Sequence, residues 1–424
     1  MSERKSLWDR YMSWMERTLV PLFTKVGSQR HMVVLRESFL SIISLILVGS
    51  IFLILPNLPG LMDILAPYKQ YFDIPFQMTF GLVAVYLSFL IAYNLAGTYK
   101  VDQIAAGITS MMVFLITAFF PLVKDGTVYM SLEWLGTWGI FGAIVIGFYT
   151  AELFRIMIQK GWYFKPPPGV PPGVTRFIMA TLPQLVIMLP VLLITVLGIR
   201  IPTLITEAAK PLIVLADTYP AFLLMLFIEH LTWYVGVHSW SLIGPIYFPF
   251  IISNQLANAE ALAKGMAMRY IATFNTYFGG SAGGTGSHFP MIIFGLRSKS
   301  KTVRTVSRAG FIPVLLNINE PVLFGFPVIL NPIFFIPHCI LAPLIRSLTY
   351  VVTAAGLVKP CYIVFFAFVP NPFLWYLGNL DPAAIFWGII IGYVLPAIAY
   401  YPFFKVYERA MIALEQQQAT QVGK

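Results

Sequence analysis

The chain has 424 residues and a formal net charge of +10, and it is 58% hydrophobic but only 11% charged. Soluble globular proteins carry about a quarter charged residues, so this composition excludes an ordinary soluble enzyme. The positive charge does not indicate a nucleic-acid partner, because the basic residues lie in the gaps between long apolar runs.

Those apolar runs have the length of helices that cross a lipid bilayer. Such a helix needs about 20 consecutive apolar residues, and runs of this kind begin at Ser38 and at Met179, among other places. A transmembrane β-barrel would instead show roughly ten-residue segments that alternate apolar and polar residues. The sequence therefore predicts an all-α polytopic membrane protein that is surrounded by lipid.

Residues 1–33 have a mixed, charged pattern. Their apolar residues recur at about helical spacing, namely Leu7, Trp8, Tyr11, Trp14, Met15, Leu19 and Leu22. A cleavable signal peptide would have a short basic start followed by an apolar core. We therefore predict a cytoplasmic amphipathic helix that lies in the membrane interface.

The first half of the chain is predicted to contain five membrane spans, near residues 35–56, 74–96, 101–123, 135–158 and 176–199. Basic residues are concentrated before the first span, within 155–176 and within 297–308, and the positive-inside rule places these segments in the cytoplasm. The gaps near 63–73 and 124–133 have no basic excess and are expected outside. Both termini are then expected in the cytoplasm. The connector 165–174 is too rich in proline to be helical and should form a stiff extended loop.

Beyond residue 200, Gly, Pro, Asn and His interrupt the apolar stretches. Irregular backbone at membrane depth is tolerated only where it is buried in protein or lines a wet cavity, and in transporters it indicates the substrate site. We therefore predict a scaffold half at 34–200, a transport half at 201–410 and a cytoplasmic tail at 411–424.

The strongest site candidate is Glu320, in the stretch "NINEPVLFGFPVILNP". An ionisable residue inside the membrane is costly and indicates a functional site by default. Pro321 prevents a regular helix from running through this point, and Asn317, Asn319 and Asn331 are candidate partners for the carboxylate and the unpaired backbone groups. The alternative is that Glu320 only caps a helix that the proline breaks.

Two histidines and three tryptophans are further candidates. His230 and His238 are eight residues apart, which is not a metal-ligand spacing. His230 is expected to be a packing residue, whereas glycines around His238 indicate an open turn. Trp233, Trp240 and Trp375 can stack on a sugar ring, although packing or a membrane interface explains each of them better when it is taken singly.

Two other sequence features argue against phosphate, metal and redox chemistry. The glycine-rich stretch "YFGGSAGGTGSHFP" lacks the ending of a P-loop, so we predict a membrane-depth loop or a close helix approach there. Cys339 and Cys361 both lie in apolar surroundings, which gives no support for a disulfide or a cysteine-based metal site. We expect no metal and no cofactor.

A carboxylate, an imidazole and amides lined by indole rings fit a neutral solute rich in hydroxyl groups. A charged substrate would need a countercharge, and no cluster of intramembrane Arg or Lys appears in the sequence. The chemistry therefore favours a sugar.

The stretch "NINEPVLFGFPVILNP" closely resembles the NxNEP signature of a known family. This signature belongs to the membrane IIC components of the bacterial phosphoenolpyruvate-dependent sugar phosphotransferase system, in the lactose, cellobiose and diacetylchitobiose branch. "AYNLAGTYKVDQIAAGITSMMVFLI" resembles the family's junction between its second and third spans. The resemblance extends from about residue 30 to about residue 410.

The resemblance implies about ten transmembrane helices with re-entrant hairpins in the C-terminal half, an N-terminal half that mediates homodimerisation, and a location in the bacterial inner membrane. It also implies that Glu320, Asn317, Asn319 and His238 belong to the binding site for a disaccharide such as cellobiose, diacetylchitobiose or lactose. The phosphoryl group would come from separate IIA and IIB proteins, with no phosphorylated residue on this chain. One departure is that the glycine-rich stretch is longer than the family's "GGSG" and contains His288, which leaves the sugar open.

Two other functions are compatible with a polytopic membrane protein. In an ion-coupled sugar symporter Glu320 would be the coupling site, and transport would depend on an ion gradient. An intramembrane hydrolase is disfavoured, because the sequence shows no paired carboxylates, Ser/His dyad or two-metal cluster.

Overall fold

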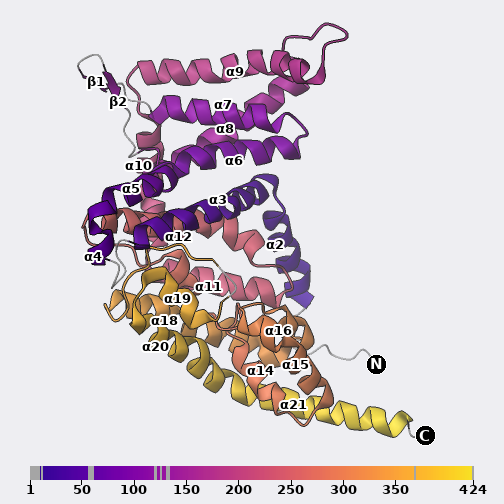
Figure 1. Ribbon diagram of the computed structural model, residues 1–424. Coiled ribbons are helices and arrows are strands. Elements are labelled where there is room, and N and C mark those ends of the chain that lie inside the picture. Colours follow the sequence, from indigo (N-terminus) through magenta and orange to yellow (C-terminus); the bar gives the residue numbers. More distant parts are fainter. Residues whose placement is uncertain are drawn as a thin grey trace. The chain divides into compact units, whose positions relative to one another are not determined.

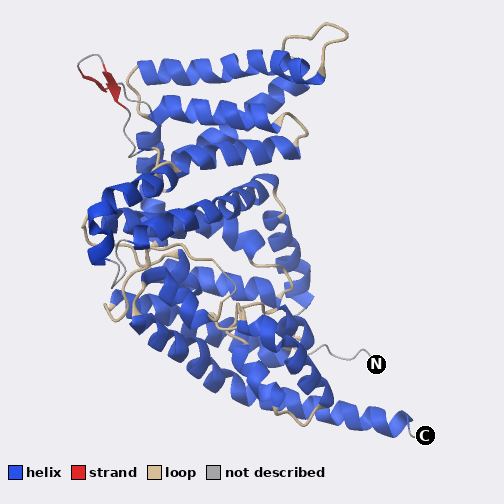
Figure 2. Cartoon of the chain, viewed as in Figure 1, coloured by secondary structure: helices blue, strands red, loops and turns tan. Residues whose placement is uncertain are grey.

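The computed structural model describes residues 10, 13–55, 62–118, 122–124, 127–129, 134–366 and 369–422. In this part of the chain the only strands are β1 (Leu122–Lys124) and β2 (Thr127–Tyr129), which pair antiparallel (Figure 2). The predicted helical class is therefore confirmed. The chain forms two compact units, Gln29–Leu215 and the described residues of Met1–Ser28 with Ala216–Lys424.

The unit Gln29–Leu215 is a set of mostly long helices (Figure 1). Its helical elements are α3 (Arg30–Ile54), α4 (Met62–Leu65), η3 (Ala66–Tyr68), α5 (Lys69–Thr79), α6 (Val83–Thr98), α7 (Gln103–Ala118), η5 (Thr137–Gly139), α8 (Ile140–Gln159), α9 (Pro172–Val196) and α10 (Ile201–Ala216). The predicted spans near 35–56, 135–158 and 176–199 coincide with α3, α8 and α9. The predicted span near 74–96 covers the end of α5 and most of α6, and the one near 101–123 covers the shorter α7. Residues 201–215, which the sequence analysis assigned to the transport half, belong to this unit.

The proline-rich connector ends earlier than predicted. Residues 165–171 are not helical, but α9 already begins at Pro172, inside the stretch expected to be extended. Proline is well tolerated in the first turn of a helix, where its missing N–H would have no partner. Large apolar side chains at the far end of α9 are open to the surroundings, with Val196 and Leu197 74% and 76% exposed. Such exposure fits a lipid environment.

The second unit contains shorter and more interrupted helices. Its elements are η1 (Met15–Leu19), α2 (Val20–Gly27), α11 (Tyr219–Tyr234), α12 (Trp240–Ala263), α13 (Phe274–Phe278), α14 (Phe289–Leu296), α15 (Lys301–Leu315), α16 (Glu320–Gly325), α17 (Pro332–Phe335), η6 (Ile336–Leu341), α18 (Ala342–Ala354), α19 (Asn371–Asn379), α20 (Pro382–Ile389), η7 (Ile390–Val394) and α21 (Leu395–Val422). The predicted change of pattern beyond residue 200 is confirmed by these interruptions.

Among the described residues, six helices are long and apolar enough to cross a membrane, or seven if α10 and α11 together form one broken span. Helix α7 is apolar but shorter than these spans. The described part of the chain thus contains several helices whose length and composition suit a membrane span.

The N-terminal segment is helical where it is described. Met15 is fully buried and packs in a cluster with Tyr234 and Val235, while Trp14 remains exposed. The described residues are thus helical with a buried and an exposed side chain, whereas Leu7, Trp8 and Tyr11 lie outside them.

Amide side chains on α12 hold the irregular segments of the second unit in place. Gln255 accepts a hydrogen bond from the Asn275 N–H at 3.0 Å and donates to the Asn275 Oδ1 at 2.9 Å. Asn275 in turn exchanges two hydrogen bonds with the backbone of Phe365, at 2.9 and 3.1 Å. These bonds satisfy backbone groups that no helix satisfies, and they set the position of α13 and of the loop before α19.

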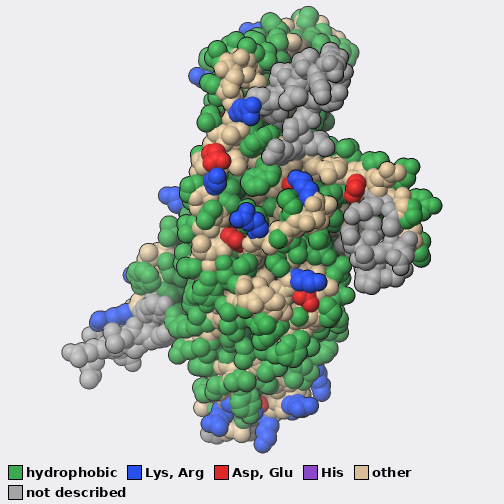
Figure 3. Space-filling model, turned by 90° about the vertical axis from the view of Figure 1, so that its left-hand side faces the viewer, with side chains coloured by type: hydrophobic (Ala, Val, Ile, Leu, Met, Phe, Trp, Pro, Cys, Tyr) green, Lys and Arg blue, Asp and Glu red, His purple; other side chains and the backbone are tan. Residues whose placement is uncertain are grey.

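Charged side chains are sparse on the face shown in Figure 3, where hydrophobic side chains dominate. Lys and Arg side chains gather at the lower end of this view. The exposed basic residues of α14, α15 and their connection are Arg297, Lys299, Lys301 and Arg308. The basic segment found in the sequence is therefore a surface feature of the second unit.

Candidate functional site

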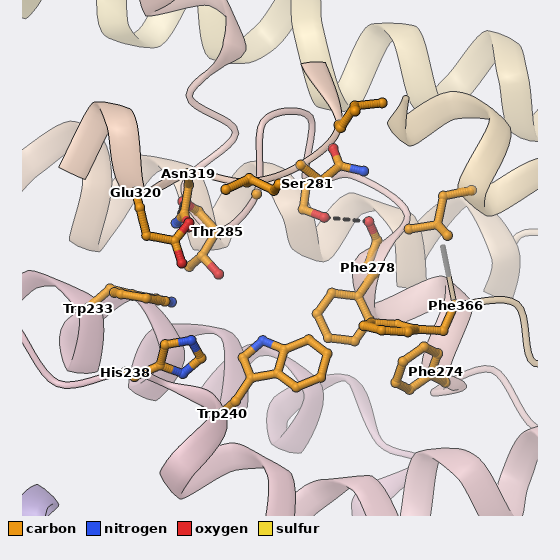
Figure 4. Close-up of a pocket in the computed structure, with 15 residues that line it drawn as sticks. Trp233, His238, Trp240, Phe274, Phe278, Ser281, Thr285, Asn319, Glu320 and Phe366 are labelled. Atoms are coloured by element: carbon orange, nitrogen blue, oxygen red, sulfur yellow. Dashed lines mark hydrogen bonds between the residues drawn. The ribbon is translucent and has the colours of Figure 1, made fainter. Parts of the chain in front are cut away.

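The second unit contains a cavity of about 410 Å³, within the range of pockets that hold small organic ligands. Its walls come from the end of α11, the start of α12, α13, the glycine-rich loop between α13 and α14, and the connection between α15 and α16. Figure 4 shows Glu320 and Thr285 on one side, facing Trp233 and His238. Trp240 lies between this polar end and an apolar end formed by phenylalanines.

Glu320 lies at a break between two helices. Helix α15 ends at Leu315, Asn317 adopts a left-handed backbone with φ of 65°, and α16 begins at Glu320 with Pro321 in its first turn. This confirms the predicted interruption at the proline. The half-buried carboxylate lines the cavity and also stands in the first turn of α16.

The asparagines of the motif bind other partners than the expected carboxylate. Asn317 accepts a hydrogen bond from the Gly283 N–H at 3.1 Å and donates to the Val369 carbonyl at 2.7 Å. Asn319 donates to the Thr285 carbonyl at 3.1 Å. The expectation that these amides would satisfy Glu320 is corrected, because they tie the motif to neighbouring loops. Asn331 likewise accepts from the Ile333 N–H, at the start of α17.

The glycine-rich stretch forms a loop that packs closely on this motif. Gly284 has a φ of +79°, and a Cβ placed there would lie 2.8 Å from the Asn317 carbonyl oxygen and 2.8 Å from the Asn319 Cβ. Only glycine fits this backbone conformation without strain, so the interpretation as a loop at a close approach is confirmed. Ser281 and Thr285 of the loop line the cavity. Neither side chain stands out in the sequence, where both lie among glycines without a recognisable motif.

The histidines separate into one cavity residue and a buried group. His238 lines the cavity, and its ring centroid is 4.5 Å from that of Trp233. His230 is fully buried and donates from Nδ1 to the Leu226 carbonyl of its own helix at 2.6 Å, which confirms it as a packing residue. His288 and His338 are also buried and lie 3.0 Å apart between Nε2 and Nδ1. His288 therefore does not line the cavity.

Of the three tryptophans, Trp233 and Trp240 line the cavity and Trp375 does not. Trp240 lies at 5.6 Å from Phe278 and 5.5 Å from Phe366 between ring centroids, so its ring continues an aromatic wall. Trp375 is fully buried in an apolar cluster with Val352 and Ile391. A Cβ on Gly279 would come within 2.7 Å of its ring. Trp375 thus supports the glycine-rich loop from behind.

One buried pair was not anticipated from the sequence. Glu229 on α11 and Arg346 on α18 form an ion pair at 2.9 Å, and Glu229 also accepts from the Thr285 hydroxyl at 2.7 Å. Charged residues within the apolar runs "FIEHLTWY" and "LAPLIRSLTY" were the available signal. Because the two charges compensate each other, Arg346 offers no free countercharge for an anionic substrate.

The cavity therefore has the chemistry of a site for a neutral polyol. It offers the carboxylate oxygens of Glu320 and the hydroxyl of Thr285 to hydroxyl groups, the imidazole of His238 as a further polar partner, and aromatic faces to C–H groups. Among the residues that the structure describes, no group of three or more His, Cys, Asp or Glu side chains could hold a metal ion. Both cysteines are free and buried.

Comparisons with known proteins agree with this chemistry. The profile of the family "Phosphotransferase system, EIIC" matches residues 36–343. A Bacillus subtilis (strain 168) protein named "Putative permease IIC component YwbA" is 32% identical, over 93% of this chain and 94% of its own. The oligo-beta-mannoside-specific EIIC component of the same organism is 30% identical, over 95% of both chains.

A solved structure is also similar along nearly the whole chain. The crystal structure of the transporter ChbC, the IIC component from the N,N'-diacetylchitobiose-specific phosphotransferase system, has a TM-score of 0.86 and 27% identity. The match covers 95% of this chain and 99% of that chain. The family profile, the relatives and the shared fold together show that this chain belongs to the EIIC family, the sugar-translocating membrane permeases of the phosphotransferase system.

Proposed function

We propose that this permease binds a β-linked disaccharide, such as cellobiose, diacetylchitobiose or lactose, in the cavity that Glu320 lines. The observation on which this proposal depends is the placement of one carboxylate across a small cavity from indole and imidazole rings. The relatives named for oligo-beta-mannosides and for diacetylchitobiose support the substrate class. Dependence on an ion gradient, as in a symporter, is not expected.

The residues around the cavity have different roles in this proposal. Glu320 accepts hydrogen bonds from sugar hydroxyl groups, and His238 adds one donor or acceptor. Trp240 offers a flat face to the C–H groups of a sugar ring. Asn317 and Asn319 position the motif through their bonds to Gly283 and Thr285. Trp375 does not contact the sugar in this proposal but packs against Gly279 and so supports the glycine-rich loop.

The chain is proposed to translocate sugar without phosphorylating it. Its site residues offer a carboxylate, amides and one imidazole for binding, and the family operates together with IIA and IIB proteins that transfer the phosphoryl group. We infer that no residue of this chain is phosphorylated, and that a IIB protein meets the permease at its cytoplasmic face.

Equilibrium binding of labelled sugars tests the proposed substrate class. We expect detergent-purified protein to bind a labelled β-linked disaccharide saturably, because the cavity volume and its aromatic walls fit two sugar rings. Unlabelled cellobiose should compete, whereas maltose, its α-linked isomer, should compete at least tenfold more weakly, which corresponds to about 1.4 kcal/mol. Equal competition by the two isomers would contradict specificity for the β-linkage.

The membrane arrangement is proposed from the charge pattern and the family resemblance. We propose about ten spans with re-entrant hairpins, both termini in the cytoplasm, and a homodimer formed through the N-terminal half. Cysteines introduced singly at residues 2 and 423 should resist an impermeant thiol reagent in intact cells, because both termini are proposed to lie in the cytoplasm. The native Cys339 and Cys361 are buried and should not contribute to the signal. Labelling from outside would contradict this topology, and a monomeric mass in mild detergent would contradict the dimer.

A further inference from the structure

The buried ion pair between Glu229 and Arg346 lies directly behind the cavity wall. The Arg346 Nη1 is 2.9 Å from the Glu229 Oε2, and the side chains are 0% and 2% exposed, respectively. Removing two charges from water is costly, and a buried pair is often no more stabilising than apolar residues of similar size. The presence of this pair therefore calls for a role other than stability alone.

The pair holds the glycine-rich loop at both of its ends. At the start of the loop, the Arg346 Nη2 donates to the Tyr277 carbonyl at 3.0 Å. Near its other end, the Thr285 hydroxyl donates to the Glu229 Oε1 at 2.7 Å. The Thr285 carbonyl then accepts from Asn319, the residue next to Glu320. A continuous set of hydrogen bonds thus joins Arg346 to the sugar-binding motif.

The loop between these two ends needs such support. It contains five glycines, of which Gly283, Gly284 and Gly286 have positive φ angles. Glycine loses more conformational freedom on ordering than any other residue, and this loop has no helix or strand to order it between α13 and α14. Side chains from α11 and α18 therefore add to the contacts of Asn317, Asn319 and Trp375 that order this cavity wall.

We infer that Glu229 and Arg346 are positioning residues for sugar binding, and that they hold the glycine-rich loop in the conformation that completes the cavity. This inference rests on the proposed function only in naming a sugar as the ligand. A second consequence follows at Thr285. Its hydroxyl hydrogen is committed to Glu229, so its oxygen presents only lone pairs to the cavity and accepts from the ligand, as Glu320 does.

The test combines sugar binding with hydrogen exchange in two variants of the full chain. Arg346→Lys keeps a positive charge beside Glu229, but a lysine ammonium lacks the planar fork that reaches both Glu229 and the Tyr277 carbonyl. Glu229→Gln/Arg346→Met removes both charges together and keeps an oxygen that Thr285 can reach. Both variants avoid leaving an unpaired buried charge, which would endanger folding.

In both variants we expect the dissociation constant of the disaccharide to rise about tenfold, equivalent to weakening one hydrogen bond to the sugar. Amides of residues 279–288 should lose protection from hydrogen exchange, while those of α12 remain protected. Glu408→Gln is the matched control, because it breaks the Lys405–Glu408 pair at 2.7 Å in the same unit, away from the cavity. Its affinity and loop protection should equal those of the unaltered protein.

Unchanged affinity and unchanged loop protection in a folded variant would overturn the inference, as would a lower melting temperature with an unaltered dissociation constant. If the double variant does not fold, the dissociation constant and the loop protection of Arg346→Lys test the inference. If the unaltered protein binds no disaccharide, the proposed function fails. The loop inference is then judged by hydrogen exchange alone, so the two failures are distinguishable.

Discussion

Replacement of Glu320 by Gln is expected to weaken disaccharide binding by roughly two to four powers of ten. The carboxylate lines the cavity at the break before α16, where each of its oxygens can accept a hydrogen bond from a sugar hydroxyl. Charge-assisted bonds contribute about 1.5 to 3 kcal/mol each, and each 1.4 kcal/mol corresponds to about a factor of ten. Glutamine keeps the shape but turns one acceptor into a donor. Equilibrium binding to purified protein measures the change.

His238→Ala serves as the comparison for this experiment. A neutral imidazole offers one donor or acceptor, where the carboxylate offers several lone pairs, so the loss of affinity should be smaller than for Glu320→Gln. Both variants should elute from a sizing column as the unaltered protein does, because neither side chain belongs to the buried core of the second unit. Unchanged affinity in Glu320→Gln would contradict the proposed site. Glu320 would then be explained as a helix cap, and the sugar would have to bind elsewhere.

Sugar phosphate is expected to form only when IIA, IIB and the general phosphocarrier are all supplied with this permease and phosphoenolpyruvate. The expected effect is all or none, because the proposed site has partners for hydroxyl groups but no phosphoryl donor. Membrane vesicles containing the permease, loaded on the inside with the soluble proteins, should convert external labelled disaccharide to its phosphate. Chromatography of the labelled product measures the yield.

Vesicles that lack IIB provide the control for this reaction. They should bind the sugar with unaltered affinity and release it unmodified, which separates binding from phosphorylation. Formation of sugar phosphate from phosphoenolpyruvate and this chain alone would contradict the proposed division of labour. Accumulation of free sugar that follows a proton or sodium gradient would favour the symporter alternative.

Packing decided the roles that composition left open. The sequence alone does not distinguish Trp375 from Trp240. In the structure, Trp375 lies against Gly279 in a buried cluster, whereas Trp240 lines the cavity. In the same way, the motif asparagines bind Gly283 and Thr285 because their side chains meet the glycine-rich loop, which is separated from them by more than 30 residues in the chain. A sequence pattern reports local periodicity and cannot report which distant segments meet.

The sequence by itself determined the helical membrane class, the break before Pro321 and the selection of Glu320 as the strongest site candidate, whereas His238 was selected through the family resemblance. The first three follow from properties of consecutive residues, namely apolar length, the missing proline N–H and the cost of an intramembrane charge. Only the tertiary structure decided that Thr285 and Ser281 line the cavity and that Glu229 and Arg346 stand behind it. Glu229 and Arg346 lie 117 positions apart in the chain. Their pairing depends on the packing of α11 beside α18, which brings the two charges together and offsets part of the penalty that either would incur alone.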